Sequence, residues 1–455
     1  MFKKYVCVTL VTMFGVFCLN SIASGDEMAS LKKQMAAMQK QMAEQARQMD
    51  RMQKKIGELE ANKPAESPVA AVTQPAKPAD NDLRVYWKNG IRMETADDKF
   101  NLKIGGRVMV DTAGMWEDTA VKNAFGALNA NAEFRRARFY MSGDIYEDFV
   151  YKLQVDFASG DVGLRDAYIG VKDIPYLGQI RVGQYTEPIS LENMTSSNYI
   201  TFMERDMPED ILCPHRNDGI SFNNTMFDER ATLSVGAFMD ADDHGLVTSN
   251  EVNFTGRVTA LPWYEEDGAK LLHLGAAYSF RNVKETQYAG DPEAHLAPDF
   301  LDTGVIAVDH VNLVGLEAAL IYGPFSVQGE FLESFVDQKD GPSNTHFEGA
   351  YLQASYFLTG EHRNYDTAVA EFGGIAPKRN FSIKDWSPGA WEVAARYSYL
   401  DLNDDNIKVG ILSDVTLGIN WYLNPNMRVM LNYVHAHSNG KGNADIAMMR
   451  FQVNY

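Results

Sequence analysis

The feature that most constrains this fold is a strict alternation of apolar with polar or small residues in the C-terminal stretch 415–455. The alternation runs through 415–422 and again through 429–433, on either side of an Asn-Pro-Asn turn at 424–426. A period of two is what a β-strand imposes on its two faces, and Asn and Pro favour turns. A last apolar face ends on the aromatic Tyr455. The stretch therefore predicts the closing strands of a barrel whose apolar side faces lipid.

The same alternation recurs from Lys99 onward in about sixteen segments, each of roughly ten residues, as in membrane barrels. Short turns and long connections separate these segments. Tight turns are expected near Glu147, Pro175, Asp228, Glu265, Pro324 and Asn424, and at Thr359 or Asp404. Long external loops are expected at Trp116–Asn131, Thr186–Arg216, Asn282–Asp309 and Thr359–Pro388. The predicted fold class is an all-β transmembrane barrel of about sixteen antiparallel strands, preceded by a short α-helical coiled coil.

A soluble β-sandwich or solenoid is the rival fold. The apolar strand faces of a sandwich would meet in a core between two sheets. In this chain aromatic residues gather at strand ends, as the interfacial girdles of a membrane barrel require. No repeat of solenoid length is detectable, and no apolar run after the N-terminal segment is long enough for a transmembrane helix. These observations favour the membrane barrel.

The N-terminal residues predict export. Two lysines, Lys3 and Lys4, precede an apolar run, and small residues follow at the spacing of a cleavage site. Residues 1–25 are therefore predicted to be a signal peptide. Cys213 would then be the single cysteine of the mature chain, so that no internal disulfide is expected.

A heptad pattern follows the signal peptide. Apolar residues recur at alternating spacings of three and four between Met28 and Leu59, which predicts a coiled coil over residues 26–62. An amphipathic helix lying on a membrane is the alternative, although its apolar stripe would be wider. A Pro- and Ala-rich linker is predicted at 63–82, because this composition cannot build a core. The β-barrel domain is predicted to span 83–455.

Charge and motifs exclude several functions. The formal charge is −19, and loss of the two signal-peptide lysines would make it −21, so that we do not expect nucleic acid as a partner. The chain has no nucleophile elbow, phosphate-cradling loop or metalloprotease helix. The segment 401–412 begins like a calcium loop, but Asn406 replaces the required glycine. We expect no enzyme activity, no metal and no cofactor.

Six distinctive stretches lie in order along the chain. They are WKNGIRMETADDKFNLKIGGRVMVD at 87–111, FRRARFY at 134–140, LRDAYIGVK at 164–172, VGQYTEPISLENMTSSNYITFMER at 182–205, YFLTGEHRNY at 356–365 and WEVAARYSYLDL at 391–402. Together they resemble the phosphate-selective porin O and P family over about residues 85–455. The resemblance implies a sixteen-stranded, trimeric barrel in the cell outer membrane, with an anion-preferring channel lined by basic residues. It places the coiled coil in the periplasm.

Strand parity divides the side chains between lumen and lipid. The cations predicted to point inward and bind anions are Lys103, Arg107, Arg136, Arg138, Lys152, Arg181, Arg257, Arg281, Arg396, Arg428 and Arg450. Arg135 has outward parity but belongs to the Arg-rich motif, and it is a further candidate that could either lie at the membrane interface or turn into loop space. Basic rings select anions, and a planar guanidinium can hold two phosphate oxygens. The alternative is that these cations pair with inward acids and only stiffen the wall.

The segment Thr186–Arg216 stands where the resemblance implies an inward-folded loop at the constriction. Its predicted constriction residues are Glu187, Glu192 and Arg205. The segment contains many acids and few bases, which would oppose a dianion, whereas a strongly phosphate-selective pore is expected to carry lysine there. The sequence therefore leaves the degree of phosphate selectivity open.

Two functions follow from these observations. We predict an outer-membrane porin, a homotrimer in the lipid bilayer, with a water-filled channel for passive diffusion of small anions that include phosphate or polyphosphate. The alternative is a structural anchor whose coiled coil tethers the outer membrane to the cell wall or to a periplasmic protein. Ion selectivity in bilayers, measured with and without the helical segment, distinguishes the two.

Overall fold

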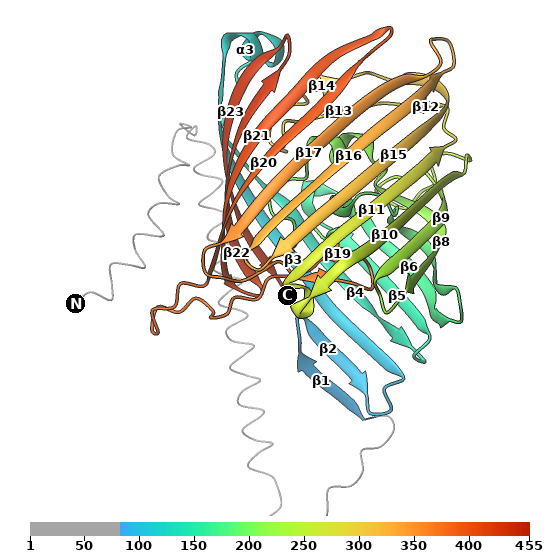
Figure 1. Ribbon diagram of the computed structural model, residues 1–455, viewed down its shortest axis with the longest axis vertical. Coiled ribbons are helices and arrows are strands. Elements are labelled where there is room, and N and C mark those ends of the chain that lie inside the picture. Colours follow the sequence, from blue (N-terminus) through green and yellow to red (C-terminus); the bar gives the residue numbers. More distant parts are fainter. Residues whose placement is uncertain (1–81) are drawn as a thin grey trace, which may run out of the picture. The chain divides into compact units, whose positions relative to one another are not determined.

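The computed structural model describes residues 82–455, which form one closed β-barrel (Figure 1). The barrel strands are β3 (Phe100–Glu117), β4 (Asn131–Ile145), β5 (Phe149–Asp156), β6 (Gly163–Ile174), β7 (Gly178–Thr186), β8 (Arg216–Met226), β9 (Ala231–Met239), β10 (Asn253–Glu265), β11 (Lys270–Arg281), β15 (Ile306–Tyr322), β16 (Phe325–Gln338), β17 (Thr345–Phe357), β20 (Ala390–Asp404), β21 (Ile407–Asn424), β22 (Met427–Ser438) and β23 (Gly442–Asn454). Each strand pairs antiparallel with the next, and β23 pairs with β3 to close the sheet. The predicted barrel of about sixteen antiparallel strands is confirmed.

The C-terminal residues close the barrel. The N–H group of Gly106 donates to the carbonyl oxygen of Tyr455 at 2.7 Å, and the N–H group of Tyr455 donates back at 2.9 Å. Along β23 the side chains of Phe451 and Val453 are exposed on the outer face, whereas Arg450 and Gln452, which alternate with them, are buried on the inner face. The stretch 415–455 thus supplies most of the last three strands of the barrel, β21 to β23.

The two ends of the barrel differ in their connections. Tight turns at one end join β4 to β5, β6 to β7, β8 to β9, β10 to β11, β15 to β16 and β21 to β22. The long connection 358–389 lies at this same end, because strand directions alternate strictly and β17 runs in the same direction as β4. The prediction that Thr359–Pro388 is a long loop opposite the tight turns was wrong. Conversely, the tight turn expected at Asp404 lies at the end with the long loops.

Three long connections enter the space enclosed by the strands. They are 187–215, 282–305 and the part of 358–389 around residues 361–375. Their short elements are α4 (Leu191–Met194), α5 (Met207–Leu212), β12 (Glu285–Thr286), β13 (Ala289–Gly290), β14 (Leu301–Asp302), β18 (Tyr365–Asp366) and β19 (Glu371–Phe372). Apolar side chains from these connections pack on the inner faces of the strands and form the hydrophobic core, as Ile189 and Phe300 do. The core therefore lies inside the barrel.

The segment 187–215 contacts the inner faces of strands that lie far apart around the barrel. Arg107 of β3 donates to Ser197 at 2.6 Å, and Glu330 of β16 accepts the backbone N–H group of Glu192 at 2.8 Å. Arg428 of β22 donates to the carbonyl oxygen of Ile200 at 2.8 Å. These hydrogen bonds fix the backbone of the segment against three parts of the wall.

The remaining elements lie at the ends of the barrel strands. A hairpin of β1 (Leu83–Trp87) and β2 (Ile91–Thr95) pairs with the beginning of β3. The remaining short helices are α3 (Thr119–Phe125), η1 (Ala158–Gly160) and η2 (Glu266–Gly268). Among residues 82–455, no helix is long and apolar enough to cross a membrane. The predicted signal peptide (1–25), coiled coil (26–62) and all but the last residue of the predicted linker (63–82) lie outside the described residues.

Candidate functional site

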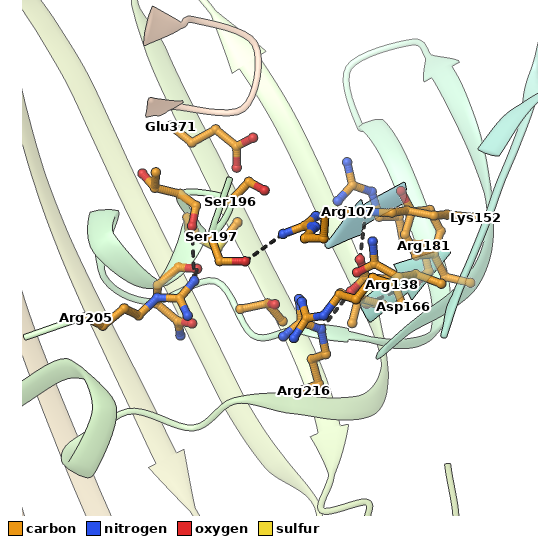
Figure 2. Close-up of a pocket in the computed structure, with 17 residues that line it drawn as sticks. Arg107, Arg138, Lys152, Asp166, Arg181, Ser196, Ser197, Arg205, Arg216 and Glu371 are labelled. Carbon is orange, nitrogen blue, oxygen red and sulfur yellow. Dashed lines mark hydrogen bonds and ion pairs between the residues drawn. The ribbon is translucent and has the colours of Figure 1, made fainter. Parts of the chain in front are cut away.

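A cavity of about 160 Å³ lies between the inner face of β3–β8 and the segment 187–215 (Figure 2). The charged side chains that line it are mostly cationic. The cations are Arg107, Arg138, Lys152, Arg181, Arg205 and Arg216, and the carboxylates are those of Asp166 and Glu371. The uncharged part of the lining comes from residues 193–197 of the segment, with the hydroxyl and amide groups of Asn193, Thr195, Ser196 and Ser197, and from Gln154, Tyr168, Tyr185 and Thr186. We call this site the basic cavity.

Adjacent strands bring these cations onto one face. Arg107 of β3 stands directly opposite Arg138 of β4 in the strand register, and Lys152 and Arg181 come from β5 and β7. The alternation of each strand points these side chains to the lumen, as their parity predicts. Like charges at opposed positions destabilise a sheet. Their placement here is therefore unfavourable for stability, which favours a functional reason for it.

Two carboxylates neutralise part of the positive charge. Asp166 of β6 accepts from Lys152 at 2.6 Å and from Arg216 at 2.9 Å. Asp156 of β5 pairs with Arg138 at 2.7 Å. One carboxylate shared by two cations leaves a positive excess, so that the basic cavity keeps a favourable potential for an anion.

Arg107 and Arg181 have no carboxylate at ion-pair distance among residues 82–455. The guanidinium of Arg107 donates to Ser197, while its buried Nε atom has no hydrogen-bond partner among these residues. The guanidinium of Arg181 bonds Gln179 at 2.7 Å and lies 5.3 Å from the centroid of the Tyr168 ring. Arg107 is buried and Arg181 is half-buried. A charge shielded from water without a counter-charge is costly, and an anion in the cavity would compensate it. These two arginines are the best-placed anion contacts in the described part of the chain.

Two further predicted cations also lack a carboxylate partner among the described residues. Lys103 is half-buried, and its ammonium group lies 5.2 Å from the centroid of the Tyr140 ring. Arg428 bonds the Ile200 carbonyl and the Gln452 side chain, at 2.8 Å in each case. Neither residue lines the basic cavity.

Four other predicted pore-lining arginines are held in ion pairs with buried carboxylates. The pairs are Arg257–Glu317 at 2.8 Å, Arg281–Glu187 at 3.1 Å, Arg396–Glu293 at 2.6 Å and Arg450–Asp111 at 2.6 Å. All four arginines extend from strands outside the β3–β8 wall. For these residues the geometry favours the alternative reading of the sequence, in which inward cations pair with acids and stiffen the barrel.

A β-bulge changes the orientation of the Arg-rich motif. Arg136 pairs with Met109 and Phe134 pairs with Val110, so that Arg135 is the extra residue between them. A bulge lets two successive side chains take the same face. Arg135 therefore turns inward, contrary to its predicted outward parity, and contacts loop space as the sequence analysis allowed.

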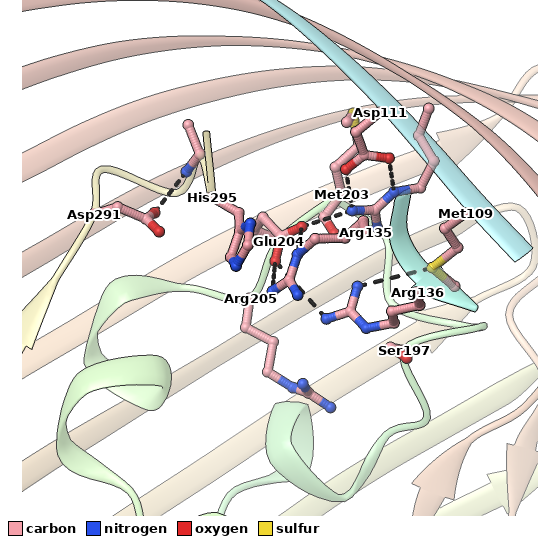
Figure 3. A network of polar contacts seen from close by, with 12 residues as sticks. Met109, Asp111, Arg135, Arg136, Ser197, Met203, Glu204, Arg205, Asp291 and His295 are labelled. Carbon is pink, nitrogen blue, oxygen red and sulfur yellow. Dashed lines mark hydrogen bonds and ion pairs between the residues drawn. The ribbon is translucent and has the colours of Figure 1, made fainter. Parts of the chain in front are cut away.

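Both arginines of the bulge approach Glu204 of the segment 187–215 (Figure 3). Arg135 donates to the two carboxylate oxygens of Glu204 at 3.0 and 2.9 Å, and Arg450 approaches the same carboxylate at 2.6 Å. Arg136 lies 3.9 Å from it. These three cations hold the pKa of Glu204 well below its usual range, against the effect of burial. The Arg-rich motif thus anchors the segment by this carboxylate.

The acids of the segment 187–215 do not line the basic cavity. Glu187 is fully buried and accepts from Asn217 at 2.6 Å and from Arg281, and Glu192 is fully buried beside Gln328, which donates to it at 3.0 Å. The expectation that this acidic segment opposes a dianion is therefore wrong for the cavity itself. Tertiary contacts place the carboxylates elsewhere and expose hydroxyl and amide groups.

Two other carboxylates of the segment favour the protonated form. Burial, together with the negative charges of Glu330 and Glu209, raises the pKa of Asp206 well above its ordinary value. Burial also raises the pKa of Glu209, although Arg205 lies 3.4 Å away and opposes this shift. Neutral carboxyl groups add no repulsion for an anion.

Arg205 shapes the segment from within. Its guanidinium donates to the carbonyl oxygens of Glu192, Asn193 and Thr195 at 3.1, 3.3 and 3.1 Å. These hydrogen bonds hold together the turn whose hydroxyl and amide groups line the cavity. Arg205 therefore lines the cavity and also positions its uncharged lining.

Sequence reasoning missed two charged residues of the basic cavity. Arg216 begins β8 directly after the long segment, and its position at a strand start was the signal that could have found it. Glu371 comes from the connection 358–389, which the sequence analysis assigned to the opposite end of the barrel. Burial and the nearby charge of Asp366 raise the pKa of Glu371 to about 7.

A closed barrel of sixteen antiparallel strands, apolar outside and with a basic cavity on its inner face, defines an outer-membrane porin. The chain belongs to the phosphate-selective porin O and P family, whose model matches residues 102–455. The predicted family and the outer-membrane location are confirmed.

Individual relatives agree with this assignment. Porin O of Pseudomonas aeruginosa is 28% identical over an alignment of 417 residues, which covers 82% of this chain and 92% of that protein. An uncharacterized protein of Caulobacter vibrioides is 28% identical over 375 residues, covering 79% of this chain and 73% of its own length. The solved structure of OmpT, an outer membrane protein of Vibrio cholerae, covers 79% of this chain and 98% of its own, with a TM-score of 0.51 at 12% identity. That similarity is one of fold.

Proposed function

We propose that this protein passes small anions, with phosphate or polyphosphate among them, by diffusion through the barrel. In this proposal the basic cavity is an anion-binding site on the diffusion path. The observation that carries the proposal is the pair Arg107 and Arg181, two inward guanidinium groups without a carboxylate partner in residues 82–455. Guanidinium groups supply charge and paired donors that replace the hydration of an anion. The neighbouring Ser and Thr hydroxyl groups supply further donors.

The segment 187–215 narrows the channel in this proposal. Its support is the set of hydrogen bonds that fix the segment to β3, β16 and β22, since a segment bonded across the lumen reduces the open cross-section. The connection 358–389 contributes from the tight-turn end, where Arg363 bonds Gln328 at 2.8 Å and Phe372 packs beside Leu191. Anions would pass where these two segments leave the basic cavity open.

The proposed assembly is a homotrimer in the lipid bilayer. The resemblance to the family implies it, and one of the similar solved structures is the trimer form of OmpT of Vibrio cholerae, with a TM-score of 0.50. The proposed partners are lipid, small anions and other copies of this chain. A tether through the predicted coiled coil falls on residues outside the described range.

Single-channel recording in planar bilayers tests the proposal. In a potassium chloride gradient, the reversal potential of the purified protein should show anion preference, and added phosphate should reduce the chloride current by occupying the basic cavity. A reversal potential of the opposite sign would show cation preference and contradict the proposed anion-binding site. If the protein prefers anions but added phosphate does not reduce the chloride current, the basic cavity attracts anions in general and does not bind phosphate.

A further inference from the structure

A short hairpin projects sideways from the barrel wall at the tight-turn end (Figure 1). It is formed by residues 381–387 of the connection 358–389. Ser382 and Ser387 exchange two backbone hydrogen bonds, at 3.1 and 3.0 Å, and the N–H group of Phe381 donates to the carbonyl oxygen of Leu423 at 2.7 Å. The hairpin is therefore tied to the end of β21, and we call it the rim hairpin.

Two stacked tryptophans hold the base of the rim hairpin. The rings of Trp391 and Trp421 lie 5.1 Å apart at 18°, and both indole N–H groups donate to the carbonyl oxygen of Pro388, at 3.1 and 2.7 Å. The Phe381 ring meets the Trp421 ring edge-on at 5.0 Å. Trp421 shares its strand face with the exposed Ile419, which belongs to the outer, lipid-facing surface. The base of the hairpin thus lies on the lipid side of the wall.

The tip of the rim hairpin is apolar and exposed. Ile383 is 73% exposed and Trp386 is 91% exposed. Lys378, Arg379 and Lys384 are close to them in the sequence with a single acid, Asp385, which makes the stretch 378–386 locally basic in an acidic chain. Tryptophan and aliphatic residues interspersed with lysine and arginine are the composition of segments that lie in a bilayer interface. Cations near such a surface are attracted to anionic lipid phosphates.

We propose that the rim hairpin is a lipid anchor, in which Ile383 and Trp386 enter the headgroup region of the leaflet at the tight-turn end. Lys384 and Arg379 then face lipid phosphates. The choice of lipid as the partner follows from continuity with the lipid-facing wall and from the basic charge of the hairpin. The anchor fixes the depth and rotation of the barrel in the membrane, and it is independent of anion selectivity.

Tryptophan fluorescence of the full chain in vesicles of phosphatidylethanolamine and phosphatidylglycerol tests the proposal. The emission of Trp386 is the difference between the native chain and the Trp386→Phe variant. This difference should be shifted to shorter wavelength than that of an indole in water. Lipids brominated near the headgroup should quench it more strongly than lipids brominated near the chain ends. In the Ile383→Lys variant the quenching should weaken, while the ion selectivity stays that of the native chain.

Two results would overturn the lipid anchor. Quenching of the Trp386 emission by aqueous acrylamide but not by brominated lipid would place the tip in water. Protection from both quenchers, together with cross-linking of an Ile383→Cys variant to a second copy, would assign the hairpin to a subunit interface. Because selectivity is measured on the same samples, failure of the anchor is separable from failure of the proposed anion function.

Discussion

The inner wall of this barrel has two regions that use arginine differently. On β3–β8 the cations outnumber their carboxylate partners, and Arg107 and Arg181 have none among the described residues. On the strands from β10 to β23, arginines such as Arg257, Arg396 and Arg450 are each held by a buried carboxylate, and Arg428, which bonds a backbone carbonyl and an amide oxygen instead, is an exception. The number of inward arginines therefore does not set the charge that an ion meets. The partners of each arginine set it.

The difference also separates stability from selectivity. A buried ion pair carries no net charge. Removing one of its two side chains leaves the other as an unpaired charge in a medium of low polarity. An unpaired cation shielded from water lowers stability but retains its field in the lumen. We expect the paired region to govern unfolding and the unpaired region to govern permeation, and the four predictions below test this division.

The largest effect is expected from Arg450→Ala in the paired region. The substitution leaves the carboxylates of Asp111 and Glu204 without this cation and should lower the free energy of unfolding by about 3–5 kcal/mol. Urea unfolding in detergent micelles measures the change. Arg450→Lys, which keeps the charge, is the matched control and should lose less. A loss below about 1 kcal/mol for the alanine variant, typical of exposed pairs, would contradict the division.

The next effect is expected from the double variant Arg107→Gln with Arg181→Gln in the basic cavity. The anion-to-cation permeability ratio should fall by roughly tenfold, since about 1.4 kcal/mol of lost attraction corresponds to that factor. Reversal potentials in a salt gradient measure the ratio. Lys284→Gln, which removes a cation whose side chain is 82% exposed, is the matched control and should leave the ratio unchanged. An equal fall in both variants would remove the basic cavity from the selectivity mechanism.

A smaller effect is expected from the pH. The pKa of Glu371 is raised to about 7 by burial and by Asp366, so that this carboxyl is neutral below that pH and negative above it. Raising the pH through about 7 should therefore add a negative charge to the basic cavity and lower the anion preference. Glu371→Gln should abolish the change between about pH 6 and about pH 8. Persistence of the same pH dependence in this variant would show that another group titrates.

The smallest effect is expected from Asp166→Asn. This substitution removes the carboxylate that Lys152 and Arg216 share, and both cations should then attract anions more strongly. The anion-to-cation ratio should rise by roughly two- to threefold, since solvent in the lumen screens part of the added field. A fall in the ratio would mean that Asp166 is needed to hold the two cations in place.

The sequence predicted the wall better than the contents of the lumen. Alternation assigned the inward face correctly for Arg107, Arg138 and Arg450, because pairing with neighbouring strands preserves a period of two. The assignment failed at Arg135, where one inserted residue in β4 changes the parity locally. No alternation pattern marks such a bulge, because it depends on the partner strand.

The sequence by itself determined the closed barrel, because a period of two over the length of a strand leaves one face for lipid and one for the lumen. It also marked the segment 187–215 as long and the motif at 134–140 as basic. Only the tertiary structure decided which charges remain unpaired. That outcome depends on contacts between residues far apart in the chain, such as those of Glu204 with Arg135 and Arg450. A local sequence pattern does not predict such contacts. The basic cavity therefore forms only when the lumen is assembled, whereas the alternation within the strands already predicts the barrel that encloses it.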